Sequence, residues 1–65
     1  MSNLTPEQQS KLQQMATVVK TSARKLVGIS IDEDVSSVMS SEDMKEALAK
    51  SIMLLEYAQK IEDKI

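Results

Sequence analysis

The sequence predicts an all-α protein with two long antiparallel helices and a short connecting helix, as a three-helix bundle or a helical hairpin. Apolar residues recur at spacings of three and four near both ends of the chain, the period of an amphipathic helix. The only proline and the only glycine lie where a helix should begin and end. We expect one small domain, residues 1–65, with helices at about 6–27, 31–39 and 42–64.

The first helix has a clear predicted start. Thr5 can cap it, Pro6 suits the first helical position, and Gln8 sits where the capping-box partner belongs. Gly28 lies where the helix should stop, because glycine readily adopts the left-handed conformation that ends helices. The residues expected on its apolar face are Leu12, Met15, Ala16, Val19, Ala23 and Leu26.

The segment 29–39 is open to two interpretations. Ser30 and Glu33 are spaced as a capping box, which favours a short helix of two to three turns. Its apolar residues fall at i, i+4, i+7 and i+8, on one helical face: Ile31, Val35, Val38 and Met39. The alternative is an extended segment, because every second residue from 27 to 31 is apolar. A lone strand has no second strand to pair with, so we predict the helix.

The closing helix carries the widest apolar stripe of the chain. Ser41 is its expected N-cap, followed by Glu42 and Asp43 near the positive end of the helix dipole. Its apolar seam comprises Ala47, Ser51, Leu54, Ala58, Ile61 and Ile65, and Met44, Leu48, Ile52 and Leu55 widen it on one side. Because this stripe exceeds what one helix covers, we expect the middle helix or a second copy of the chain to cover the rest.

Composition limits how such a chain can be stabilised. With 65 residues and neither Cys nor His, it lacks the disulfides and zinc sites that support many small domains. The hydrophobic fraction of 42% and the net charge of −2 are ordinary for a folded protein. The thin aliphatic core favours a homodimer, in which two long helices from each chain would form a four-helix bundle.

The same composition argues against membranes and secretion. No basic region followed by an apolar core opens the chain, so we expect no signal peptide. The longest purely apolar run covers residues 52–55, far below the roughly 20 residues of a membrane span. We therefore expect a cytoplasmic protein that does not bind membranes.

One stretch, residues 23–39, resembles the helix-turn-helix family of DNA-binding proteins. It has a small residue at Ala23, a glycine at Gly28 and an apolar anchor at Val35. The resemblance implies a recognition helix that enters the major groove. That helix would open with three acids, residues 32–34, which repel phosphates. We expect no nucleic-acid partner, and keep a compact DNA-binding transcriptional regulator as the alternative function.

The residue inventory also argues against catalysis. The chain has no histidine base, no cysteine nucleophile and a single glycine, which is too few for a phosphate-binding loop. We expect no enzyme, no catalytic residue, no cofactor and no metal. The predicted function is a small regulatory module that binds and modulates a larger protein, as an inhibitor, a chaperone-like cap or a regulatory subunit. Its predicted partner-binding residues are Met53, Tyr57, Lys50, Leu54 and Ile61.

Overall fold

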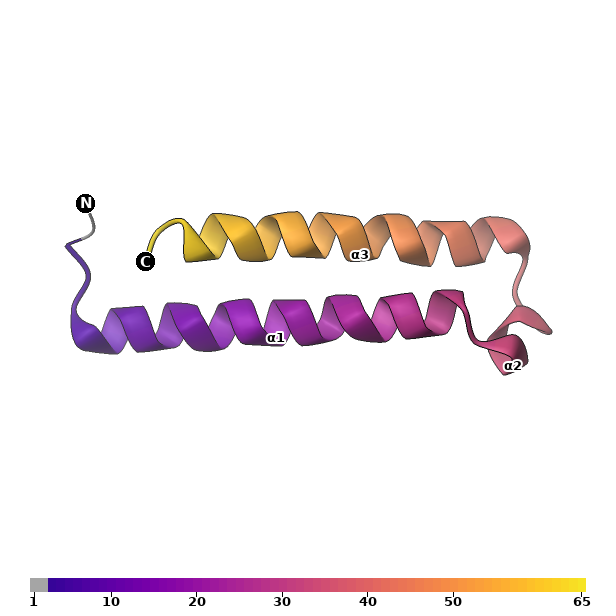
Figure 1. Cartoon of the computed structure of the whole chain (residues 1–65), viewed down its shortest axis with the longest axis horizontal. Coiled ribbons are helices and arrows are strands. Elements are labelled where there is room, and N and C mark those ends of the chain that lie inside the picture. The colour runs from indigo at the N-terminus through magenta and orange to yellow at the C-terminus, as the bar shows by residue number, and fades with distance from the viewer. Residues whose placement is uncertain (1–2) are drawn as a thin grey trace.

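The computed structural model describes residues 3–65, which form an antiparallel helical hairpin (Figure 1). Helix α1 spans Pro6–Ser30, α2 spans Glu33–Ser36 and α3 spans Ser41–Glu62. α1 and α3 lie side by side along almost their whole length, and the start of α1 and the end of α3 lie at the same end of the hairpin (Figure 1). The Cα atoms extend over 49 × 15 × 10 Å, so the molecule is a rod one helix layer thick. The predicted all-α class is confirmed, in its hairpin form.

Helix α1 begins where the sequence predicts it. The hydroxyl of Thr5 accepts a hydrogen bond from the backbone N–H of Gln8 at 3.1 Å. The side-chain oxygen of Gln8 accepts one from the N–H of Thr5 at 3.0 Å, which completes the capping box.

The predicted end of the first helix at residue 27 is wrong, because α1 continues through Gly28 to Ser30. Gly28 has no positive φ, so it does not make the left-handed turn that ends many helices. Ser30 extends a seven-residue series of small residues that begins with Ala16 and Ala23, and it is half-buried. This extra turn therefore continues the side of α1 that faces α3.

The middle helix is also shorter than predicted, with four residues in place of 31–39. Asp32 caps it by accepting bonds from the N–H groups of Asp34 and Val35, so the predicted Ser30–Glu33 capping box is not used. The apolar residues predicted at its two ends gain little burial, since Ile31 and Val38 are 78% and 83% exposed, whereas Val35 within α2 is half-buried. A short helix needs tertiary packing to persist, and here Val35 is the only apolar residue of α2 that supplies it.

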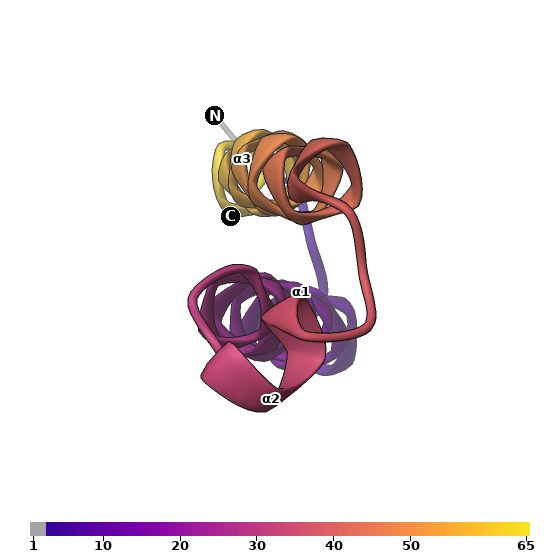
Figure 2. The same cartoon turned by 90° about the vertical axis from the view of Figure 1, so that its right-hand side faces the viewer.

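Helix α2 lies against the end of α1, on the side away from α3 (Figure 2). The expectation that the middle helix covers part of the closing helix is therefore wrong. This placement leaves the outer sides of α3 without cover from the described residues of the chain.

Helix α3 starts one residue earlier than predicted. Its N-cap is Ser40, not Ser41, and the Ser40 hydroxyl accepts from the N–H of Asp43 at 3.1 Å. Glu42 and Asp43 occupy the first turn, as expected for the positive end of a helix dipole. The helix ends at Glu62, two residues before the predicted end.

The seam between α1 and α3 consists mainly of small side chains. The buried residues are Ala16 and Ala23 of α1, and Met44, Ser51, Ala58 and Ile61 of α3. Ala16 and Ala23 are seven residues apart, as are Ser51 and Ala58, so each helix presents a small side chain to its neighbour every second turn. Small residues at a helix contact let the two backbones approach closely. The buried Ser51 hydroxyl donates to the Leu48 carbonyl at 2.6 Å, so its polar atom is satisfied.

Candidate interaction surfaces on α3

Several large apolar side chains of α3 lie outside the seam, although Met44 and Ile61 are buried within it. Ile52, Met53 and Tyr57 are 51%, 66% and 48% exposed, whereas the buried Ala58 is fully covered. Single exposed apolar residues are normal in soluble proteins, but several of them on one helix make it a candidate contact surface. These residues divide into two surfaces, one on each flank of α3.

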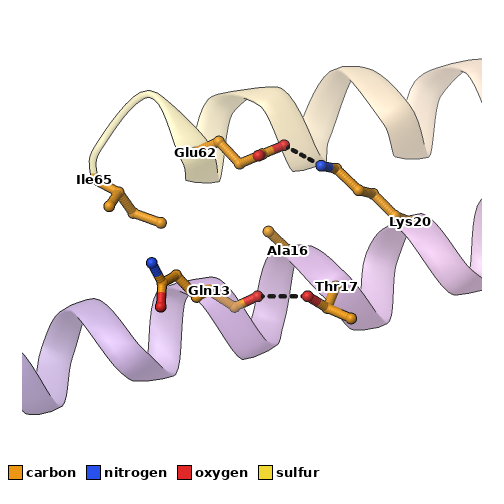
Figure 3. A pocket seen from close by; sticks show the side chains of 6 residues that line it. All are labelled: Gln13, Ala16, Thr17, Lys20, Glu62 and Ile65. Atoms are coloured by element: carbon orange, nitrogen blue, oxygen red, sulfur yellow. Dashed lines mark hydrogen bonds and ion pairs between the residues drawn. The ribbon is translucent and has the colours of Figure 1, made fainter.

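The first surface is located by an ion pair that joins the two helices. The Lys20 ammonium lies 2.7 Å from a Glu62 carboxylate oxygen, across one side of the hairpin (Figure 3). A side chain returns to nearly the same side of a helix after seven residues, with a drift of about 20°. Val27 follows Lys20 by seven residues, and Leu55 precedes Glu62 by seven. These residues therefore lie on the same side as the ion pair.

Two more residues complete this first surface. Leu48 precedes Leu55 by seven residues, and Ile52 neighbours both within one helical turn. We name this set, Val27, Leu48, Ile52 and Leu55, the Leu48 surface. All four side chains are exposed.

The open end of the hairpin on this side is polar. A hollow of about 320 Å³ is lined there by Gln13, Ala16, Thr17, Lys20, Glu62 and Ile65 (Figure 3). Thr17 donates from its hydroxyl to the Gln13 carbonyl at 3.0 Å. Glu62 is already engaged by Lys20, and both side chains remain more than a third exposed. The hollow is thus bordered by an ion pair that joins the two helices.

The second surface lies on the opposite flank of α3. Tyr57 precedes Glu62 by five residues, which places it about 140° around the helix from the ion pair. It lines a groove of about 440 Å³ with Leu12, Met15, Lys60, Ile61, Asp63 and Lys64. A neighbouring hollow is lined by Leu26, Lys50, Met53 and Leu54. We name the exposed residues here, Met15, Lys50, Met53, Tyr57 and Lys60, the Tyr57 surface.

The structure separates the five residues predicted to bind a partner. Met53, Tyr57 and Lys50 lie together on the Tyr57 surface. Leu54 is half-buried at the base of the adjacent hollow. Ile61 is only 4% exposed and belongs to the seam, so it is a core residue rather than an accessible contact.

Sequence reasoning leaves the Leu48 surface out of the predicted site. Leu48, Ile52 and Leu55 share a helical stripe with the seam, so the spacing assigns them to packing. The signal that could identify them is the width of that stripe, which exceeds what one neighbouring helix covers. The spacing likewise assigns Met15 to the inner face of the first helix, yet this side chain is 44% exposed.

The stretch that resembles a helix-turn-helix does not have that geometry. The helix passes through Gly28 without a turn, and the four residues of α2 span only about 6 Å. A recognition helix must be long enough to lie in a DNA groove. Residues 23–39 therefore present no such element.

Other kinds of site are also missing from the described part of the chain. Within residues 3–65, no three His, Cys, Asp or Glu side chains converge to hold a metal ion. None of the described helices combines the length and apolarity needed to cross a bilayer. No known protein family, characterised protein or solved structure matches this chain.

Proposed function

We propose that this chain is a small, non-enzymatic interaction module that binds a larger protein through the Tyr57 surface and modulates it. The observation that carries this proposal is the pair formed by Met53 and Tyr57. They lie one turn apart on a long helix and are 66% and 48% exposed. An inhibitor, a chaperone-like cap or a regulatory subunit would use such a surface in the same way.

The two side chains have the properties of binding anchors. Tyrosine offers a large apolar ring with a polar tip and is enriched among the residues that dominate interface energies. Methionine is flexible and polarisable, so it adapts to irregular apolar pockets. Because α3 already orders both residues, binding requires little further loss of backbone entropy.

The charges around this pair indicate the chemistry of the partner. Lys50 and Lys60 flank Met53 and Tyr57, and Lys64 lines the same groove as Tyr57, while the acids Glu56 and Asp63 line the same hollows. Lys50 also pairs with Glu46 at 3.7 Å, and the three lysines outnumber the two acids by one. The complementary partner is a protein with an apolar groove edged by carboxylates, which receives α3 as an amphipathic helix.

Capture from native lysate with Tyr57→Ala and Met53→Ala variants tests the proposal. A protein retained by the unmodified chain should be retained at least about tenfold less well by Tyr57→Ala, because truncating an interface anchor removes about 1.4 kcal/mol or more. Circular dichroism should show unchanged helicity, since both side chains are exposed. Retention should also fall as salt rises, because the lysines contribute electrostatically.

Val38→Ala is the matched control. Val38 is an apolar residue 83% exposed in the connection between α2 and α3, remote from the Tyr57 surface. This variant should capture the same protein as the unmodified chain. If Met53→Ala and Tyr57→Ala also capture it undiminished, the Tyr57 surface is not the contact site.

A further inference from the structure

The hairpin exposes more surface than a compact monomer of its mass. Its accessible surface is 5138 Å² for 7.2 kDa, whereas folded monomers of that mass expose about 4100 Å². The excess of about 1000 Å² is comparable to the roughly 800 Å² that each partner buries in a standard protein interface. One further contact of ordinary size would bring this chain to the usual degree of burial.

The shape of the molecule also indicates that a further contact is needed to bury its apolar surface. Stable domains have at least two packed layers of secondary structure around an apolar core. This chain provides one layer, 10 Å in its thinnest dimension. The Leu48 surface is an apolar part of one side of that layer, and no described residue covers it.

The sequence of α3 is self-complementary about its own midpoint. The midpoint of Ser41–Glu62 falls between Ser51 and Ile52, and the midpoint between Leu48 and Leu55 falls at the same place. Consider a second copy of α3 related to the first by a two-fold axis that crosses the helix between Ser51 and Ile52. The two helices would be antiparallel and would overlap along their whole length. Leu48 of each copy would meet Leu55 of the other, and the two Ile52 side chains would meet near the axis.

The charges at the ends of this stripe fit the same arrangement. Lys45 precedes Ile52 by seven residues, while Gln59 and Glu62 follow it by seven and ten. The two-fold axis places Lys45 opposite position 58 of the other copy, one residue from Gln59 and about 6 Å along the helix from Glu62. A two-fold contact between identical copies needs such a self-complementary surface, because residue i of one copy meets residue j of the other, and j meets i in turn.

We propose that a second copy of this chain covers the Leu48 surface, with α3 antiparallel to α3 and α1 antiparallel to α1 in a four-helix bundle. This dimer leaves the Tyr57 surface of each copy on the outside. The proposal does not rest on the proposed function, because the two surfaces lie on opposite flanks of α3.

Sedimentation of the whole chain over a range of concentrations is the first test. The unmodified chain should reach twice 7.2 kDa. Ile52→Glu should return it to 7.2 kDa at the same concentration, because it places two carboxylates beside the axis. Ala49→Glu is the matched control: Ala49 is exposed on the same helix but outside the Leu48 surface, so that variant should stay dimeric. A mass of 7.2 kDa for the unmodified chain at every concentration would overturn the proposal.

Disulfide cross-linking keeps the test decisive if Ile52→Glu fails to fold. The chain contains no cysteine, so each single cysteine variant reports one position. Ile52→Cys should form a covalent dimer under mild oxidation much faster than Ala49→Cys or Met53→Cys. Faster cross-linking through Met53→Cys would mean that copies pair through the Tyr57 surface, and the proposal would be wrong. Tyr57→Ala should leave the dimer intact, so loss of partner capture and loss of dimerisation remain separate results.

Discussion

The inward and outward sides of α3 differ in a way that is unusual for a small protein. The side that faces α1 carries Ala47, Ser51 and Ala58, while the flanks carry Ile52, Met53 and Tyr57. Large apolar side chains normally fill the core, and small or polar ones face water. Here four of the six residues buried in the described part of the chain are Ala or Ser, with Met44 and Ile61 as the larger exceptions, so the contact between the helices depends largely on close backbone packing and dispersion. Ile52, Met53 and Tyr57 remain available for contacts with other molecules.

A larger side chain in the seam should destabilise the hairpin more than any change on the outward sides. Ala58 has no exposed surface, so a leucine at this position has to push the two helices apart. We expect Ala58→Leu to lower the free energy of unfolding by about 1–3 kcal/mol, the usual range for overpacking a core. Urea denaturation at one fixed protein concentration measures this difference.

Ala49→Leu is the control for that experiment. Ala49 is an alanine of the same helix but is exposed, so the same substitution there should change the free energy of unfolding by less than about 0.5 kcal/mol. Equal losses for the two variants would show that the seam is not closely packed. A gain for Ala58→Leu would show the same.

A substitution at Gly28, on the outward side of α1, should stabilise the hairpin, and by less than Ala58→Leu destabilises it. A Cβ atom added there meets no atom within 4 Å, and the residue is helical with no positive φ. Gly28→Ala should raise the free energy of unfolding by about 0.5–1 kcal/mol, because alanine loses less backbone entropy on forming a helix. Thermal unfolding followed by circular dichroism measures it. A loss of stability would instead mean that the helix ends at Gly28, as the sequence predicts.

The Lys20–Glu62 ion pair, which lies between the seam and the Leu48 surface, should contribute least to the free energy of unfolding. A double-mutant cycle with Lys20→Met and Glu62→Gln should give a coupling energy of about 0.2–1 kcal/mol, since both side chains are partly exposed. The coupling should weaken at high salt. The Glu7–Lys11 pair within α1 is more exposed, with its atoms 3.6 Å apart, and should couple less. A larger coupling energy for Glu7–Lys11 than for Lys20–Glu62 would mean that the ion pair between the helices does not stabilise the hairpin more than an ordinary surface pair does.

The start of α1 was predictable because its signals are local. Thr5, Pro6 and Gln8 lie within four residues, and they form the capping box without help from the rest of the chain. The end of α1 was not predictable in this way. Gly28 favours a stop, yet the seven-residue series of Ala16 and Ala23 continues to Ser30, and the helix continues with it.

The candidate surface was predictable in part. Met53 and Tyr57 lie off the apolar seam in a helical projection, so their exposure follows from the sequence period alone. Ile61 and Leu55 both lie within the wide apolar stripe, and one is buried while the other is exposed. The period cannot separate them, because it gives the width of a stripe but not the direction from which the neighbouring helix approaches.

The sequence by itself determined the number and kind of long helices, the cap at the start of α1 and the excess of apolar surface on α3. These features depend on side-chain spacing and on hydrogen bonds within a few residues. Only the tertiary structure decided that α2 lies away from α3 and that Leu48, Ile52 and Leu55 stay uncovered. Those outcomes depend on how two helices rotate against each other, and the energy of that contact is summed over residues far apart in the chain.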